Sequence, residues 1–241
     1  MAWGLGQAWR ARLPARCEAC GAWPHGPLCP ACRAELAPLV PRCPGCALPY
    51  PDPDTPCAAC RAAPPPWRAV RARLDYADPW DRWILRLKTP TGLGLAEPLA
   101  RLWLDDPQVA ALLRAADGWL PVPLARERLA QRGHNQAWTL MRALARLTAA
   151  PPARAQALRR AADAPVLHHL DAAGRRAQEA RLLAVEPAAA AWVRGRHLLV
   201  VDDVMTTGTT LRAATRALRQ AGAASVTALV LARTPPVSAD A

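Results

Sequence analysis

The strongest apolar pattern in the chain lies near its C-terminus, between residues 198 and 231. Leu198 to Val201 are four consecutive branched apolar residues, as expected of a strand that is buried on both faces. After a short loop, a helical pattern places four residues on one face: Leu211, Ala214, Thr215 and Leu218. A second strand, 223–231, follows. Strand, helix and strand in this order predict the crossover of a parallel sheet, and therefore an α/β fold.

Three further segments have periodic patterns. Val70 to Tyr76 alternates apolar residues with Arg and Asp, which predicts a half-exposed strand. Pro79 suits the first turn of a helix, and four apolar residues then recur at helical spacing: Trp80, Trp83, Ile84 and Leu87. A short strand over 119–122 and a buried helix over 138–147 complete the pattern. Together these segments predict a mainly parallel sheet flanked by helices.

Polar residues connect the buried strand to the helix that follows it. Asp202 and Asp203 come at the end of the strand, and a loop of small residues follows: Thr206, Thr207, Gly208, Thr209 and Thr210. A Gly-containing turn before a helix lets several backbone N–H groups point at one anion, and the helix N-terminus adds partial positive charge. The segment predicts a phosphate site, with two acids placed to hold sugar hydroxyls or a hydrated magnesium ion. The alternative is a buried strand with a solvated acid pair and a Thr-rich turn.

From Val200 to Thr210 the chain resembles the phosphoribosyl pyrophosphate site of the type I phosphoribosyltransferases. In that family the two acids bind the 2′- and 3′-hydroxyls of ribose, and the Thr/Gly loop wraps the 5′-phosphate. The resemblance implies these roles for Asp202, Asp203 and the loop. Purine-salvage members carry an Asp that serves as a base where this chain has Thr206. A Walker loop is excluded because its GxxxxGK[ST] pattern is absent.

Basic residues elsewhere are candidates for the same site. Arg126, Arg128 and Arg132 follow the predicted strand at 119–122, at a spacing from which guanidinium groups can reach a pyrophosphate. A solvated basic helix face explains these three residues equally well. Lys88, the only lysine, precedes a Thr/Gly-rich stretch and is a further candidate for phosphate contact.

All eight cysteines lie in the first 60 residues, as four C-x-x-C pairs: Cys17 and Cys20, Cys29 and Cys32, Cys43 and Cys46, Cys57 and Cys60. Two thiolates three positions apart can bind one ion, so four pairs predict two closed Cys₄ zinc sites of structural type. Disulfides are the alternative, but a cytoplasmic location and the regular spacing oppose them. The spacing is compatible with sequential pairing of the pairs and with cross-braced pairing.

Composition divides the chain into two predicted domains, a double zinc ribbon with its linker at 1–66 and an α/β domain at 67–241. The first segment holds 14 of the 26 prolines and almost no periodic apolar pattern, so metal must stabilise it. It carries six basic and four acidic residues, whereas the second segment carries 25 basic and 15 acidic residues. This surplus of positive charge fits a polyphosphate or nucleic-acid partner; a generic basic surface is the alternative.

The same composition bears on location. No apolar run approaches the roughly 18 residues of a membrane span, and the N-terminus lacks the continuous apolar region of a signal peptide. We therefore expect a cytoplasmic protein without membrane insertion.

Several motifs occur in one order: the C-x-x-C pairs, Tyr76 with a helix ending at Lys88, Val122-Pro123-Leu124 with Arg128 and Arg132-Gly133-x-Asn135-Gln136, and VVDDVMTTGTT. Over residues 15–233 this order resembles the ComF family of bacterial proteins, which combine a double zinc ribbon with a phosphoribosyltransferase-like domain. The resemblance implies two structural zinc ions, and Mg²⁺ with phosphoribosyl pyrophosphate at the acid pair. Family members are associated with handling of single-stranded DNA in natural transformation, or with DNA as a nutrient, so DNA-uptake proteins are implied partners.

The chain departs from the family pattern in an Arg- and Ala-rich stretch whose first polar landmark is Leu158-Arg159-Arg160. The family has Thr-x-x-Gln and later Arg-x-x-Asn followed by Phe; this chain has 164–167 as APVL, 175–178 as RRAQ, and Leu183 near the Phe position. Three functions stay open at this point. They are handling of single-stranded DNA with a retained phosphoribosyl pyrophosphate site, an active phosphoribosyltransferase with an unknown acceptor, and a phosphoribosyl pyrophosphate-sensing regulator.

Overall fold

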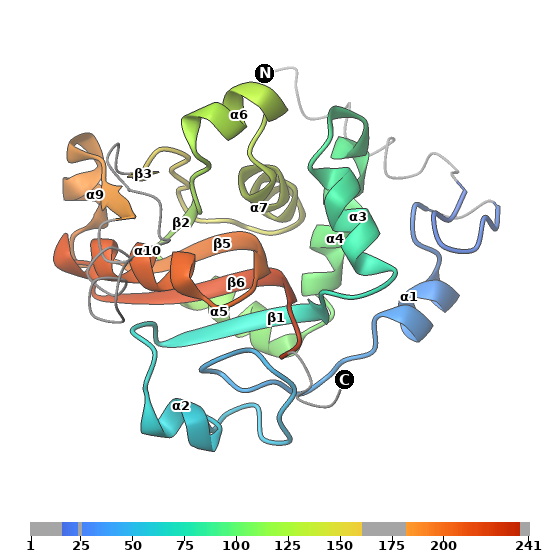
Figure 1. Ribbon diagram of the computed structural model, residues 1–241, viewed down its shortest axis with the longest axis horizontal. Coiled ribbons are helices and arrows are strands. Elements are labelled where there is room, and N and C mark those ends of the chain that lie inside the picture. The colour runs from blue at the N-terminus through green and yellow to red at the C-terminus, as the bar shows by residue number, and fades with distance from the viewer. Residues whose placement is uncertain (1–15, 24–25, 161–181, 237–241) are drawn as a thin grey trace, which may run out of the picture.

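The computed structural model describes residues 16–23, 26–160 and 182–236. At its centre is a four-stranded sheet in the order β1-β6-β5-β2 (Figure 1). The four strands are β1 (Ala69–Asp75), β2 (Gly118–Pro121), β5 (His197–Met205) and β6 (Ser225–Arg233). Every pairing in this sheet is parallel, which confirms the predicted fold class.

Helices make the connections between these strands. Those between β1 and β2 are α3 (Trp80–Leu87), the 3₁₀ helix η2 (Pro90–Leu95), α4 (Ala96–Trp103) and α5 (Pro107–Ala115). Those after β2 are α6 (Arg126–Arg132) and α7 (Gln136–Leu147). The predicted crossover helix is α10 (Thr209–Gln220), which joins β5 to β6. None of the helices within the described ranges has the length and apolarity that crossing a bilayer demands.

Smaller elements complete the structure. The cysteine-rich segment contains two short helices, α1 (Pro30–Leu36) and α2 (Ala58–Ala62). Before β5, a two-stranded antiparallel hairpin is followed by two short helices: β3 (Leu158–Arg160), β4 (Leu183–Val185), η4 (Pro187–Ala189) and α9 (Ala190–Val193).

The core consists of two apolar clusters on opposite faces of the sheet, because successive residues of a strand point to opposite sides. Leu199 and Val201 of β5 belong to the cluster formed with α3, α4 and α7. Leu198 and Val200 belong to the cluster formed with α9, α10 and the β3–β4 hairpin. The prediction of a strand buried on both faces is therefore confirmed, and the two acids that follow are directed to different faces.

The prediction that the first strand is half exposed is wrong. Arg71 and Arg73 of β1 are only 7% and 4% exposed, because the cysteine-rich segment packs against this strand. The Arg73 guanidinium donates hydrogen bonds to the carbonyl groups of Ala37 and Leu102, and that of Arg71 donates to the Pro53 carbonyl. Alternation of polar and apolar residues indicates the two faces of a strand, but not which distant segment covers the polar face. The domain boundary after residue 66 stays a prediction.

Candidate functional site

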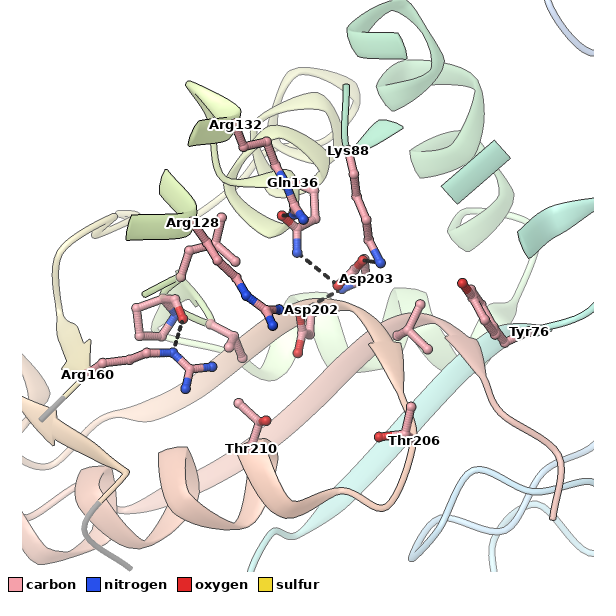
Figure 2. Close-up of a pocket in the computed structure, with 14 residues that line it drawn as sticks. Tyr76, Lys88, Arg128, Arg132, Gln136, Arg160, Asp202, Asp203, Thr206 and Thr210 are labelled. Carbon is pink, nitrogen blue, oxygen red and sulfur yellow. Dashed lines mark hydrogen bonds and ion pairs between the residues drawn. The ribbon is translucent and has the colours of Figure 1, made fainter. Parts of the chain in front are cut away.

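The carboxyl ends of β1, β2 and β5 meet at one edge of the sheet, and a cavity opens there (Figure 2). In open α/β sheets this edge is where ligands bind. The cavity is lined by Tyr76, Lys88, Val122, Pro123, Leu124, Arg128, Arg132, Gln136, Arg160, Asp202, Asp203, Val204, Thr206 and Thr210. Four basic side chains thus surround two acidic ones.

Asp202 and Asp203 lie within β5 rather than after it, and both side chains are buried. Asp203 faces the helices α3 and α7. Its Oδ2 atom lies 3.1 Å from Lys88 Nζ, and its Oδ1 atom accepts a hydrogen bond of 3.2 Å from Gln136 Nε2. Asp202 points to the other face, and its Oδ1 atom accepts a hydrogen bond of 2.9 Å from the backbone N–H of Asp203.

These surroundings shift the pKa values of the two acids in opposite directions. Burial raises the pKa of Asp202 well above its usual range, and the neighbouring charge of Asp203 raises it further. Burial also acts to raise the pKa of Asp203, but the charge of Lys88 and the hydrogen bonds to this carboxylate outweigh burial, so its pKa is lowered. The surroundings therefore favour a negative charge on Asp203 and oppose one on Asp202.

The turn between α6 and α7 forms the wall next to Asp203. Gly133 ends α6 in the left-handed conformation, with φ of 76°, which glycine adopts most easily. His134 Nε2 lies 2.9 Å from the carbonyl oxygen of Leu87, the last residue of α3. This contact holds the turn beside Lys88, the next residue along the chain.

Asn135 and Gln136 connect this turn to the sheet and to the acid pair. Asn135 caps α7 with its side-chain oxygen, and its Nδ2 atom donates a hydrogen bond of 2.9 Å to the Val122 carbonyl. Gln136 accepts a hydrogen bond of 2.6 Å from Arg132 Nη1 and donates to Asp203. Arg132 thus reaches the acid pair through Gln136. The sequence analysis placed Asn135 and Gln136 in the family motif but assigned them no role.

The Thr/Gly loop runs from the end of β5 into α10. Gly208 has φ of 80°, and a Cβ atom there would lie 2.8 Å from Met205 Cε and 3.3 Å from Trp67 Cη2. Both the conformation and the lack of space therefore require glycine at this position. The loop leads directly into the N-terminus of α10, where backbone N–H groups and the helix dipole favour an anion.

The threonines of this loop divide into two groups. Thr206 and Thr210 line the cavity, while Thr207 and Thr209 lie outside its lining. The hydroxyl oxygens of Thr207 and Thr209 are 2.9 Å apart, so these two side chains contact each other.

The structure places three of the four predicted basic residues at the cavity. Lys88, Arg128 and Arg132 line the cavity, and Arg126, the first residue of α6, does not. Arg160 of β3 joins the lining, although the sequence analysis treated it only as a polar landmark. Figure 2 shows Arg128 and Arg160 extending toward Asp202 from one side of the cavity.

The side of the cavity near Arg128 and Arg160 has an excess of positive charge. Burial lowers the pKa of Arg160, and the charge of Arg128 lowers it further, while the nearby Asp202 acts in the opposite direction. Two guanidinium groups therefore converge beside an acid whose ionisation burial opposes. Such an arrangement fits an anion with several oxygens, such as a phosphate or pyrophosphate group.

The cysteines form two clusters of four, Cys17, Cys20, Cys29 and Cys32 in the first and Cys43, Cys46, Cys57 and Cys60 in the second. This is the sequential pairing. All eight are free thiols, and the four sulfur atoms of each cluster lie within 4.8 Å of one another. The sulfurs of Cys20 and Cys29 are 3.8 Å apart. A tetrahedron of sulfurs with metal–sulfur distances of about 2.3 Å has edges of about 3.8 Å, whereas a disulfide measures about 2.0 Å.

Backbone N–H groups stabilise thiolates in both clusters. Cys29 N–H donates to Cys17 Sγ at 3.4 Å, and Cys57 N–H donates to Cys43 Sγ at 3.2 Å. Burial acts to raise the pKa of each acceptor, but the backbone hydrogen bonds outweigh it and lower the pKa of Cys17 to about 6 and that of Cys43 to about 7. Neighbouring thiols and burial raise the pKa values of Cys32, Cys46 and Cys60, so ionisation of all four thiols of a cluster needs a cation among them. The thiolate is the metal-binding form, and the four converging sulfurs of each cluster fit a metal ion.

Comparison with known proteins agrees with this architecture. Residues 166–237 match the family described as "Phosphoribosyl transferase domain". The chain is 32% identical over 232 residues to DNA utilization protein YhgH of Salmonella typhimurium, covering 95% of this chain and 97% of that protein. It is 30% identical over 182 residues to competence protein F of Haemophilus influenzae, covering 73% of this chain and 78% of the relative.

Among solved structures, the chain is similar to the glutamine phosphoribosylpyrophosphate amidotransferase of B. subtilis, with 21% identity and a TM-score of 0.38. The similarity covers 58% of this chain and 26% of that one.

The fold and the cysteine clusters define the class of protein: a phosphoribosyltransferase-like α/β domain preceded by two four-cysteine clusters consistent with a double zinc ribbon. Within that class, the chain belongs to the ComF family, as the order of its motifs predicts. The departures from the family pattern at 164–167 and 175–178 lie outside the described residues. Leu183, near the family's Phe position, is buried in β4.

The opposite shifts in the acid pair predict opposite effects of neutralising each acid. Asp202→Asn should raise the free energy of unfolding of the ligand-free protein at pH 7 by on the order of 1–2 kcal/mol, because it removes a carboxyl whose ionisation burial opposes. Asp203→Asn should lower it by a similar order of magnitude, because Lys88 loses its buried partner. Urea denaturation of zinc-replete proteins measures both changes, with Glu127→Gln on the exposed side of α6 as control.

The effect of Asp202→Asn should also depend on pH. The raised pKa of Asp202 means that its native-state penalty is absent below the ordinary Asp pKa and grows as pH rises through the folded-state pKa. The gain in the variant should therefore shrink as pH is lowered. A gain that is constant with pH, or equal signs for the two variants, would contradict the assigned charges.

Proposed function

We propose that the cavity binds phosphoribosyl pyrophosphate together with Mg²⁺. The observation that carries the proposal is a buried acid pair that lies between an anion-binding loop and a group of converging basic side chains. Adjacent carboxyl groups suit the two neighbouring hydroxyls of a ribose ring, and the loop 206–210 suits its 5′-phosphate. Arg128 and Arg160 supply guanidinium groups for the pyrophosphate, with Lys88 and Arg132 on the far side of the acids.

The residues also fit a hydrated magnesium ion. Mg²⁺ takes oxygen ligands and keeps several of its own waters, so one or two carboxylates are sufficient to hold it with a phosphate ligand. Asp202 would hold it, since burial opposes the ionisation of this acid and a nearby cation favours it. Asp203 would stay paired with Lys88 and Gln136. The ion would supply positive charge to the pyrophosphate.

The same geometry limits the chemistry that can follow binding. Displacement of pyrophosphate from C1 of the ribose depends mainly on positioning and electrostatics, which the acid pair and the arginines can supply. A base is a separate requirement. Asp202 and Asp203 are the only carboxylates in the described lining, and Thr206 stands where purine-salvage enzymes carry one. We therefore propose ligand binding as the primary activity; transfer to an acceptor that must lose a proton needs a base from elsewhere.

We further propose that the protein acts in DNA utilisation. Two observations support this role: the relatives are named for DNA utilization and competence, and the segment 67–241 has 25 basic against 15 acidic residues. Single-stranded DNA would bind through its phosphates on the basic surface rather than at the acid pair, which repels phosphates. We expect this work to take place in the cytoplasm, with proteins of DNA uptake as partners.

We propose that each cysteine cluster holds one structural Zn²⁺. Four thiolates fill a tetrahedral zinc completely, and such sites stabilise segments that have a small core of their own.

The proposed binding of phosphoribosyl pyrophosphate predicts a calorimetric result. Titration of phosphoribosyl pyrophosphate with Mg²⁺ into zinc-replete protein should give saturable heat, and the double variant Asp202→Asn/Asp203→Asn should give none. Asp117→Asn, an exposed acid at the opposite edge of the sheet, should retain the wild-type affinity.

A second comparison separates the parts of the ligand. Arg160→Gln should weaken phosphoribosyl pyrophosphate binding by at least about tenfold, which corresponds to loss of a charge-assisted hydrogen bond. The same variant should bind ribose 5-phosphate like wild type, because this ligand has no pyrophosphate. Wild-type binding by the double Asn variant would contradict the proposal.

For DNA, fluorescence anisotropy with a labelled oligothymidine should show affinity that falls steeply between about 50 and about 200 mM salt. The double Asn variant should bind the oligonucleotide at least as tightly as wild type, because it removes repulsion of DNA phosphates. Absence of binding at micromolar protein, or binding insensitive to salt, would count against single-stranded DNA.

For zinc, metal analysis of protein purified without chelators should give about two zinc per chain. Treatment with a chelator should release both ions and unfold the cysteine-rich segment first, which hydrogen exchange can follow by peptide. Cys57→Ser should retain about one zinc, since only the second cluster loses a ligand. Protein that contains no zinc would overturn the assignment.

A further inference from the structure

Arg233, the last residue of β6, connects the second cysteine cluster to the Thr/Gly loop 206–210, the phosphate loop of the proposed function. Its Nε atom donates a hydrogen bond of 2.8 Å to the carbonyl of Cys46, one of the four cysteines of the cluster. Its Nη1 atom donates to the carbonyl of Met205, at 3.1 Å, and to that of Thr206. One guanidinium group therefore contacts the backbone of the cluster, the end of β5 and the first residue of the loop.

Trp67 makes a second connection between the same two places. Its indole is 4% exposed, and its Nε1 atom donates a hydrogen bond of 3.0 Å to the carbonyl of Gly45, which lies in the turn between Cys43 and Cys46. On the other side, the ring faces Gly208 of the loop, where an added Cβ atom would lie 3.3 Å from Trp67 Cη2. Arg212, in the first turn of α10, stacks over this ring at 5.5 Å. The indole is thus packed between the cluster and the loop.

The turn between Cys43 and Cys46 has little room to move when the four cysteines of the cluster are in place. A Cβ atom at Gly45 would lie 2.7 Å from both Cβ and Sγ of Cys60, so the Gly45 backbone packs tightly on a ligand residue. The carbonyl of the preceding Pro44 accepts a hydrogen bond of 2.8 Å from the N–H of Val70 in β1. The carbonyl groups of Gly45 and Cys46 are therefore positioned by the cluster on one side and by the sheet on the other.

Charge supports the same connection. A tetrahedral zinc with four thiolates carries a net charge of about −2. The charge of Arg71 interacts with Asp106 and Asp54 and, more weakly, with Cys43, and its buried Nε and Nη1 atoms have no hydrogen-bond partner in the described structure. Arg42 forms an ion pair with Asp75 and donates to the carbonyl of Ala47, the residue after Cys46. A metal-loaded cluster would add negative charge near these two arginines.

The first cluster provides an internal contrast. The contacts between its segment and the rest of the protein include two ion pairs, Glu18 with Arg86 and Arg33 with Asp105. Arg86 belongs to α3, and Asp105 follows α4, so both contacts lie away from the phosphate loop.

We propose that the metal-loaded second cluster positions the phosphate loop through Arg233 and Trp67, so that metal in this cluster and a ribose phosphate in the cavity strengthen each other's binding. Such coupling is reciprocal by thermodynamic linkage. The identity of the ligand, a ribose phosphate, rests on the proposed function. Arg233 contacts neither ligand in this arrangement and is a positioning residue.

The first experiment measures protection of the cysteines in the zinc-replete full chain. Saturating phosphoribosyl pyrophosphate with Mg²⁺ should slow alkylation of the second cluster by at least about fivefold, the lower end of usual coupling, and leave the first cluster unchanged. Mass spectrometry of the two cysteine-containing peptides separates the clusters. In Arg233→Lys the protection should disappear, because lysine lacks the separate Nε and Nη1 donors that bond the carbonyls of the two elements. Arg219→Lys, which alters an arginine bonded to two carbonyls at the far end of α10, should keep it.

Equal protection of both clusters, or full protection in Arg233→Lys, would overturn the proposal, since either result means general stabilisation rather than a specific connection.

The second experiment needs no ligand, so it separates failure of this proposal from failure of the proposed function. Hydrogen exchange of the peptide covering the loop 206–210 should be at least about fivefold faster in Cys57→Ser than in wild type. Cys29→Ser, in the first cluster, should leave the loop unchanged. Arg233→Lys, which retains all eight cysteines, should reproduce the effect of Cys57→Ser. Unchanged exchange of the loop in Arg233→Lys would overturn the proposed connection between the second cluster and the loop. Faster exchange in this variant, together with no calorimetric binding of phosphoribosyl pyrophosphate to the wild-type protein, would overturn only the identity of the ligand.

Discussion

Two neighbouring carboxyl groups are buried at the end of the central strand β5, where they lose hydration and repel each other. The surrounding elements compensate them unequally. The end of α3 brings Lys88 to Asp203, and the α6–α7 turn, fixed by His134 and Asn135, brings Gln136 to the same acid. Asp202 forms no ion pair among the described residues, and burial raises its pKa well above its usual range. In the free protein, Asp202 is therefore an acid whose ionised form would be stabilised by a cation or by sugar hydroxyls. A buried group that lowers the stability of the free protein in this way is typical of a binding site.

The cysteine-rich segment depends on the α/β domain as much as on its own sulfurs. It covers β1, where Arg71 and Arg73 donate to its carbonyl groups. Buried guanidinium groups are stable only when carbonyls or negative charge surround them. The second cluster is therefore connected to the packing of the sheet, and through Arg233 to the backbone at the end of β5.

Much of this arrangement could be predicted from local patterns. The run 198–201 indicated a buried strand, and C-x-x-C spacing indicated two four-cysteine clusters. The phosphate site that the acid pair and the small-residue loop indicated stays a prediction. The remaining features depend on contacts between distant segments. Arg160 comes to the cavity on a hairpin with no strong sequence pattern, and Arg71 looked exposed because alternation does not identify a covering segment. Arg126 was indistinguishable from Arg128 by spacing, since only the direction of α6 decides which of them reaches the cavity.

A crystal structure of the zinc-replete protein with phosphoribosyl pyrophosphate and Mg²⁺ would test the central claim most directly. The ribose hydroxyls should lie at Asp202 and Asp203, with the 5′-phosphate in the loop 206–210. The pyrophosphate should lie beside Arg128 and Arg160. A ligand bound away from the acid pair, or a cavity that stays empty at saturating ligand, would contradict the assignment of this site.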